Sequence, residues 1–191
     1  MNKNDTADKL LTTLIKMGSN NGLDNISLSM LAKELGISKS TIFSHYKNKD
    51  ELVDCMYKKG KSITAELGMD FSFKGNAKVV LTRAVDYWHE VYSSISDFHR
   101  IVEMQKYIDK RAMNVSQSLE AMITSQSQIV IEQLNETNRL NIIELDFAIE
   151  SFSTTIIKYI QKERLNYNED FWWQEERFIN RFYNQYKISH K

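Results

Sequence analysis

The sequence predicts an all-α protein, and three observations carry that prediction. The 191 residues include no proline, whereas a chain of this length carries about ten at the usual ~5%. Glycine occurs only six times, so the residues that typically form the tight turns and bulges of β-sheets are scarce. Apolar residues recur at three- and four-residue steps along most of the chain, which is the period of a helix with one buried face. About nine helices are expected.

The first third of the chain divides into short helices. An apolar stripe from Ala7 to Met17 predicts a first helix over about 5–20. Ser27 and Ser38 are natural N-caps of the next two helices. Asn48, followed by Glu51 three residues later, predicts the start of a fourth helix over 49–67.

Longer helices are expected in the remainder. The stretch 68–75 has a glycine at each end and separates the two regions. A capping pair is expected at Asn114 and Gln117, and acids at 169–170 suit the start of the last helix. The expected helices run over about 77–95, 96–110, from 114 onward, 141–164 and 169–188. The predicted domains are 1–48, a connecting helix at 49–67, and 68–191.

Charge and cysteine content restrict the classes of protein. Lys and Arg balance Asp and Glu at 25 each, so net charge alone indicates neither a polyanion nor a membrane as partner. The single cysteine, Cys55, excludes an intramolecular disulfide and a thiolate zinc cluster, which favours the reducing cytoplasm. With no signal-like start and no long apolar run, no membrane span is expected.

Residues 26–52 have the pattern of a helix-turn-helix. Gly36 permits a positive-φ turn between two short helices, and Ala32 is small where those helices would cross. Apolar positions of both helices face one side, and the outward positions of the second are polar. Such side chains suit base edges and phosphates of DNA better than a core. The inward positions are Leu28, Leu31, Leu35, Ile42 and Tyr46, and the outward ones are Lys39, Ser40, Thr41, Ser44 and His45.

This pattern, continued through Lys47-Asn48-Lys49-Asp50-Glu51-Leu52, resembles the DNA-binding domain of the TetR family of transcriptional regulators over about residues 5–55. The rest of the chain resembles that family only in length and in its long helices. The resemblance implies a helical regulator of transcription, by default a repressor, that binds a palindromic, double-stranded DNA operator as a homodimer.

The resemblance also implies roles for single residues. Ser27 would donate to a phosphate, Ser40 and Thr41 would read bases, and Lys49 would clamp a backbone phosphate. Two aromatic positions depart from the family: it usually has Tyr at Phe43 and Phe at Tyr46. Phe43 and Tyr46 are both expected to pack against other side chains. The alternative for Tyr46 is that its phenol replaces the phosphate-binding phenol that is missing at position 43. The candidate DNA contacts are Ser27, Ser38, Lys39, Ser40, Thr41, Ser44, His45, Tyr46 and Lys49.

The last two helices are the candidates for dimerisation, because the ninth carries more apolar side chains than one core face needs. By resemblance, they would pair with their copies in a four-helix bundle. The alternative is that the same aromatics fill the chain's own core. The candidate interface residues are Phe152, Ile156, Phe171, Phe178, Ile179, Phe182, Tyr183 and Tyr186.

The resemblance further implies a ligand cavity within the fifth to eighth helices. Aromatic and thioether walls with a few polar tips suit a small apolar or aromatic effector, and they equally describe an ordinary core. The candidate linings are Trp88, His89, Tyr92, His99, Met104, Tyr107, Met122 and Gln126. Gly60, inside the fourth helix, is a candidate hinge between the DNA-binding region and the ligand-sensing region.

No enzyme is expected. The sequence has neither a phosphate-binding glycine loop nor a G-x-S-x-G motif, and His89 and His99 lie on different predicted helices without a metal-binding spacing. Neither a cofactor nor a metal is expected. The alternative to a ligand-responsive regulator is a co-regulator of the same family that acts through protein contacts without sensing a small molecule.

Overall fold

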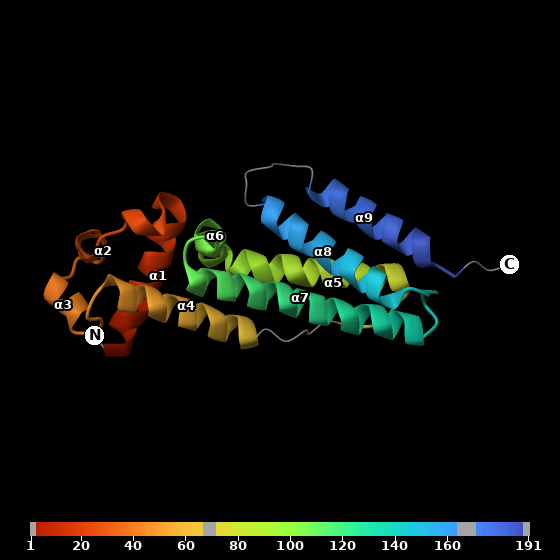
Figure 1. Cartoon of the computed structure of the whole chain (residues 1–191), viewed down its shortest axis with the longest axis horizontal. Coiled ribbons are helices and arrows are strands. Elements are labelled where there is room, and N and C mark those ends of the chain that lie inside the picture. Colours follow the sequence, from red (N-terminus) through yellow and green to blue (C-terminus); the bar gives the residue numbers. More distant parts are fainter. Residues whose placement is uncertain (1–2, 67–71, 164–170, 189–191) are drawn as a thin grey trace. The chain divides into compact units, whose positions relative to one another are not determined.

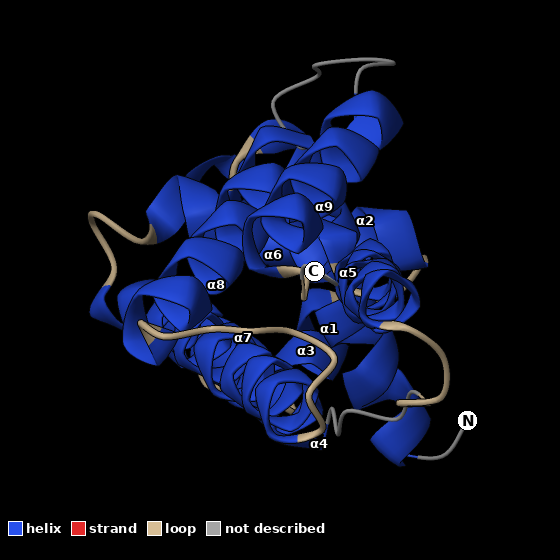
Figure 2. Ribbon diagram, turned by 90° about the vertical axis from the view of Figure 1, so that its right-hand side faces the viewer, coloured by secondary structure: helices blue, strands red, loops and turns tan. Residues whose placement is uncertain are grey.

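A computed structural model describes residues 3–66, 72–163 and 171–188, and these residues are helices joined by short loops (Figures 1 and 2). None of the described helices is both long enough and apolar enough to cross a membrane. The helices are α1 (Lys3–Asn21), the 3₁₀ helix η1 (Leu23–Asn25), α2 (Leu28–Leu35), α3 (Lys39–Phe43), α4 (Lys49–Glu66), α5 (Ala77–Ser94), α6 (Ser96–Gln105), α7 (Lys110–Glu136), α8 (Leu145–Glu163) and α9 (Phe171–Tyr186).

The chain forms two compact units, and the first combines residues 1–67 with 95–118. Its centre is α1, which packs against α2, η1, α4 and α6, while α2 packs against α3. The apolar stripe of α1 explains this, since Leu10 and Leu14 are fully buried. Fully buried side chains from the other helices complete the core of unit 1, namely Ile26, Leu31, Ile42, Leu52, Met56 and Ile101.

The second unit combines residues 68–94 with 119–191, so α7 contributes its first turns to unit 1 and the rest to unit 2. Within unit 2, α5 packs against α8 and α9, which also pack against each other. Phe152 lies at its centre, with ring centroids 5.6 Å from Phe178 and 5.1 Å from Phe182. The apolar face of α5 buries Leu81 and Trp88 completely.

Two helix starts differ from the prediction. α7 begins at Lys110 rather than after Asn114, because the Asp109 carboxylate accepts the Arg111 N–H at 2.8 Å and supplies the cap. α8 begins at Leu145, and Asn141 instead donates its N–H to the Tyr186 carbonyl at 2.7 Å. The start predicted at 169–170 lies outside the described residues.

Candidate nucleic-acid interface

The turn between α2 and α3 has the geometry that the sequence predicts. The Ser27 hydroxyl accepts the Met30 N–H at 3.2 Å and caps α2. Gly36 ends that helix in the left-handed region, at φ 63° and ψ 30°, where a side chain would be strained. The N–H of Ile37 then bonds to the Ala32 carbonyl at 2.9 Å, which closes the turn.

One serine organises the polar face of α3. The Ser38 hydroxyl accepts the Thr41 N–H at 3.1 Å, so Ser38 is the predicted N-cap. The same oxygen lies 2.6 Å from the Ser40 hydroxyl and 2.9 Å from that of Thr41. The Ser44 hydroxyl donates to the Thr41 carbonyl at 2.7 Å. The hydroxyls of α3 are therefore already oriented before any ligand arrives.

The opposite face of α3 anchors it to unit 1. Ile42 is fully buried, whereas Lys39, Ser40 and Ser44 are exposed and Thr41 and His45 are half-buried. The fold thus brings the six central candidate contacts, residues 38–41, 44 and 45, onto one short exposed segment. Ser27 is also exposed, at the N-terminus of α2.

Tyr46 and Phe43, the two aromatic residues that depart from the family pattern, differ in burial. Tyr46 is only 7% exposed and packs beneath α3, and burial is the first cause that raises the pKa of its phenol. It is a core residue and a correction to the set of predicted DNA contacts. Phe43, expected to pack, is 52% exposed, because α3 ends there with its side chain on the outer face. The sequence reasoning missed Phe43 as a candidate contact.

Lys49 has an internal partner that its predicted role did not anticipate. Its ammonium donates to the carbonyl of Leu23 at 2.8 Å and to that of Asp24 at 3.2 Å. The start of α4 is therefore tied to η1. At the same start, the Glu51 N–H donates to the Asn48 side chain at 2.8 Å, as the N-x-x-E pattern indicates. The Glu51 carboxylate accepts the N–H of Lys47 at 2.6 Å, one residue before the cap, rather than that of Asn48.

A cluster around Arg111 joins α4 to the start of α7. The Arg111 guanidinium lies 2.9 Å from carboxylate oxygens of both Asp50 and Asp109, and 5.6 Å from the centre of the Tyr57 ring. Its side-chain hydrogen bond is the main cause that holds the pKa of Asp109 below its usual value. No pattern in the sequence indicated this cluster, because its members are up to 61 residues apart.

Gly60 is explained by a close approach between two helices. It is buried in α4, and a Cβ added there would overlap the ring of Phe98 from α6. The Phe98 ring also meets Tyr57 edge-on, with centroids 6.3 Å apart. Space for Phe98, rather than flexibility, is the structural reason for a glycine at this position.

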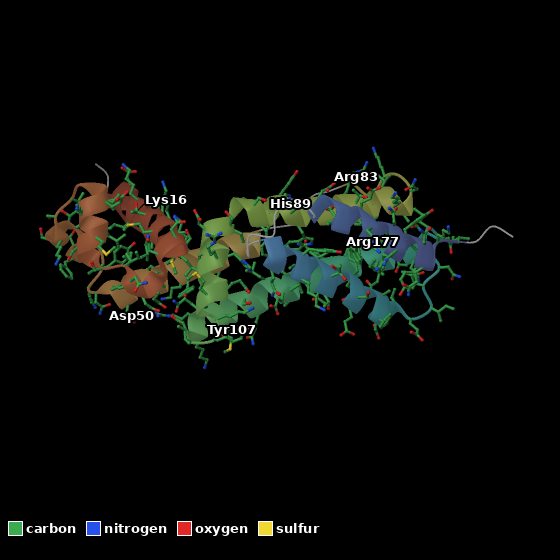
Figure 3. The ribbon with its side chains drawn as sticks, turned by 90° about the horizontal axis from the view of Figure 1, so that it is seen from above. Lys16, Asp50, Arg83, His89, Tyr107 and Arg177 are labelled. Atoms are coloured by element: carbon green, nitrogen blue, oxygen red, sulfur yellow. The ribbon has the colours of Figure 1, made fainter. Side chains whose placement is uncertain are left out.

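The predicted ligand linings are divided between the two units. Trp88, Tyr92 and Gln126 are buried in unit 2, where His89 and Met122 are half-buried. In unit 1, His99 is buried, and its Nε2 lies 3.6 Å from a Glu103 oxygen. Met104, in the last turn of α6, is 51% exposed. Tyr107, which follows the end of α6 at Gln105, is 86% exposed (Figure 3). Those two side chains lie on the surface rather than in an enclosed wall.

Most predicted interface side chains belong to the core of unit 2. Phe152, Ile156, Ile179, Phe182 and Tyr186 are buried within the chain itself, so the alternative that these side chains fill the chain's own core accounts for their burial. Phe178 and Tyr183 are half-buried, and the side chain of Phe171 lies outside the described residues. An open hollow of about 380 Å³ on α8 and α9 is lined by Thr155, Tyr159, Arg177, Phe178 and Arg181.

No group of three or more His, Cys, Asp or Glu among the described side chains could hold a metal ion. Cys55 is half-buried on α4.

Comparisons with known proteins agree with this geometry. Residues 10–56 match the family model of bacterial regulatory proteins, tetR family. An uncharacterized HTH-type transcriptional regulator of Haemophilus influenzae is 35% identical over 52 residues, which cover 27% of this chain and 28% of that protein. The chain thus matches only about a quarter of that relative's length.

Solved structures match nearly the whole chain. Their sequence identity to it is low, so the matches show a shared fold. A proposed transcriptional regulator of Saccharomonospora viridis in complex with choline has a TM-score of 0.74 at 14% identity, covering 97% of this chain and all of the other. A TetR transcription regulator of Haloarcula marismortui has a TM-score of 0.68 at 11% identity, with the same coverage. Residues 10–56, which include the capped helix-turn-helix, are thus similar to the tetR family of bacterial regulatory proteins, and the chain as a whole shares its fold with the solved structures.

Proposed function

We propose that this chain is a ligand-responsive repressor that binds a palindromic operator as a homodimer in the cytoplasm. Residues 1–48 read the DNA, residues 49–67 connect, and residues 68–191 sense the ligand and dimerise. Repression follows from occupancy, since a dimer seated on an operator excludes polymerase. Two copies are needed because one short reading helix makes too few contacts for a specific site.

The observation that carries the proposal is the construction of α3. Its exposed hydroxyls are held in place by the Ser38 cap, while Ile42 fixes the helix from below. Preoriented donors lose little side-chain entropy on binding, which suits base recognition in the major groove. Lys39, the first residue of α3, and Ser27, the cap of α2, are both exposed and can contact backbone phosphates.

Substitutions on α3 separate base reading from phosphate contact. Thr41→Val keeps the shape of the side chain and removes its hydroxyl, so it should relax preference at one or two base pairs and cost about 1–3 kcal/mol on the preferred site. Lys39→Met should weaken all duplexes alike and reduce the salt slope by about one.

Lys16→Met on α1 is the matched control for loss of one exposed lysine. Fluorescence anisotropy on the selected site and on single-base variants measures these effects. Equal, uniform losses from Thr41→Val and Lys39→Met would contradict the division of roles. Lys49 is a poor test residue because its replacement also releases the η1 carbonyls.

For dimerisation, the outward face of α8 and α9 is the surface that supports the proposal. Tyr159 and Phe178 pack edge-on there at 6.0 Å and remain half-exposed beside Arg177 and Arg181. Tyrosine and arginine are enriched where interfaces bind most strongly. The buried aromatics of α8 and α9 then support this face from within the unit.

For sensing, buried Trp88 and Tyr92 in unit 2, with half-buried His89 nearby in sequence, support an apolar or aromatic effector with one polar group. The Saccharomonospora viridis protein of similar fold holds choline, a small organic molecule. The alternative is a co-regulator that acts through protein contacts. A thermal-shift screen separates the two, because a sensor is stabilised by its effector whereas a co-regulator responds only to its protein partner.

A further inference from the structure

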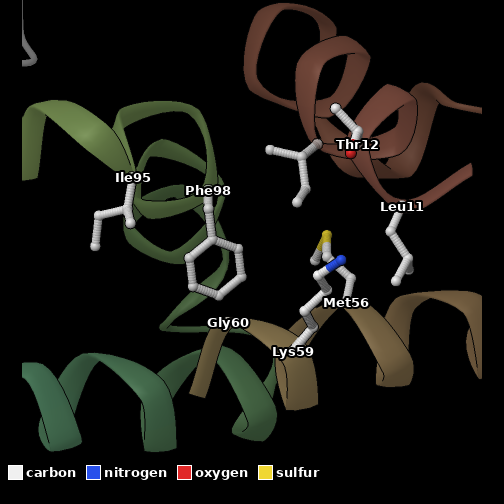
Figure 4. Close-up of a pocket in the computed structure, with 8 residues that line it drawn as sticks. Leu11, Thr12, Met56, Lys59, Gly60, Ile95 and Phe98 are labelled. Carbon is white, nitrogen blue, oxygen red and sulfur yellow. The ribbon is translucent and has the colours of Figure 1, made fainter. Parts of the chain in front are cut away.

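A small apolar cavity of about 150 Å³ lies inside unit 1, between α1, α4 and α6. Its inner wall is formed by side chains that are buried in the fold, Leu11 from α1, Met56 from α4 and Phe98 from α6. Figure 4 shows Phe98 and Met56 facing the same space. The half-buried Ile15 and Ile95 extend this wall toward the mouth.

Gly60 is what allows the cavity to exist in this form. The Phe98 ring occupies the position that a Cβ of residue 60 would need. With alanine at this position, the ring would have to move away from α4, and the cavity that Gly60 and Phe98 both line would change shape. The glycine and the cavity are thus parts of one arrangement of α4 and α6.

The rim carries polar groups but no net charge. The Lys59 ammonium forms an ion pair with Asp8 at 2.5 Å, so its charge is balanced within unit 1. Thr12 is exposed at the mouth and offers a hydroxyl. A charged occupant would have to displace Asp8 or lose hydration without compensation. The rim therefore favours a neutral occupant with at most one hydrogen-bonding group.

We infer that this cavity binds a small, uncharged, apolar molecule the size of a single aromatic ring. An apolar cavity of roughly 150 Å³ lined by Leu, Ile and Phe accepts benzene, whereas water finds too few polar partners there. The site is separate from the effector site proposed around Trp88 and Tyr92, since those residues belong to unit 2 and every residue that lines this cavity belongs to unit 1.

Occupancy of this cavity would act on DNA binding through α4. An occupant adds contacts to α1, α4 and α6 together and so favours the packing in which Phe98 lies against Gly60. That packing fixes α4, which carries the Lys49 contact to η1 at its start. This regulatory consequence rests on the proposed DNA binding, whereas occupancy itself does not.

The test uses the full chain and three probes of similar size, namely benzene, phenol and benzoate. Methyl NMR of labelled methionines follows Met56, whose signal is assigned from a Met56→Leu variant. We expect saturable shifts of the Met56 methyl with benzene and phenol, and binding of benzoate weaker by at least about tenfold. Equal binding of benzoate, or shifts that never saturate, would overturn the inference.

Two exposed positions on α1 give a matched pair of variants. Thr12→Trp fills the mouth and should weaken phenol binding by at least about tenfold, whereas Lys16→Trp, which does not line the cavity, should change it by less than about twofold. Ile15→Phe provides a second filling variant. Unchanged binding in both filling variants would show that phenol binds elsewhere.

DNA affinity measured with and without phenol then tests the regulatory consequence. We expect a change of at least about threefold in the wild type and none in Thr12→Trp. Saturated cavities with unchanged DNA affinity would overturn that consequence. If the chain without any probe binds no duplex, the proposed function fails instead, and the NMR result on occupancy stands independently.

Discussion

Phe43 is an exposed aromatic residue at the end of α3, at the position where the TetR DNA-binding pattern usually has tyrosine. Phe43→Tyr restores a phenol that can donate to a phosphate, and we expect it to raise affinity for all duplexes by about two- to tenfold. Because tyrosine is uncharged, the salt slope should stay the same. Anisotropy titrations at several salt concentrations measure both.

Phe43→Leu is the control, since it keeps an apolar side chain without a hydroxyl and should not gain affinity. A gain confined to one DNA sequence would mean that residue 43 touches a base edge rather than the backbone.

The Tyr57 hydroxyl is buried without a hydrogen-bond partner among the residues that the structure describes. Burial is also the first cause that raises the pKa of this phenol above its usual value. Tyr57→Phe should therefore stabilise the chain by about 1 kcal/mol, because an unsatisfied buried hydroxyl costs about that much. The midpoint temperature of thermal unfolding should rise by roughly 2–4 °C. A lower melting temperature would mean that the hydroxyl has a partner after all.

The start of α7 depends on one carboxylate. The Arg111 hydrogen bond lowers the pKa of Asp109, so the folded state favours the ionised form more than the unfolded state does. The resulting stability is present above the unfolded pKa of about 3.9 and is lost as pH falls through the lower folded value. Asp109→Asn should thus destabilise the chain at neutral pH by about 1 kcal/mol, and the deficit should shrink below about pH 4.

Asp50→Asn is the matched control on the other partner of Arg111. The Asp50 side chain is 78% exposed, so the loss of its ion pair should cost less than about 0.5 kcal/mol. Melting curves of both variants between about pH 3 and 8 measure the difference. Equal deficits at every pH would contradict the special role of Asp109 in starting α7.

Helix starts show how far local sequence determines the elements. Ser27 and Ser38 were predictable as caps because each accepts an N–H from a residue three positions later in its own helix. Asn114 has the same local pattern but lies inside α7, since Asp109 and Arg111 had already begun that helix. A local signal therefore predicts a cap only where no stronger start precedes it.

Contacts between distant elements were less predictable. An isolated glycine within α4 indicated a special position, but nothing in the sequence pairs Gly60 with the Phe98 ring. The aromatic side chains of α9 were recognisable as a broad apolar set, yet the sequence alone left open a core or an interface. Their burial in unit 2 is decided by packing against Phe152 of α8.

For the whole molecule, assembly should depend on the outward face of α8 and α9. Arg181→Glu reverses one charge beside the exposed parts of Tyr159 and Phe178 and should weaken the dimer by at least about tenfold. Lys187→Glu makes the same change from positive to negative charge on an exposed residue just past the end of α9, and it should have little effect on dimer affinity. Sedimentation velocity over a range of concentrations measures both. A stable dimer in Arg181→Glu would require a different interface.

Recognition of DNA by α3 is tested most directly by selecting bound duplexes from a random DNA pool with the wild-type chain and with Thr41→Val. We expect a two-fold-symmetric site with half-sites about 10 base pairs apart, and a loss of preference in Thr41→Val at one or two symmetric positions. A pool that is never enriched, or an identical preferred site for both proteins, would contradict recognition of DNA by α3.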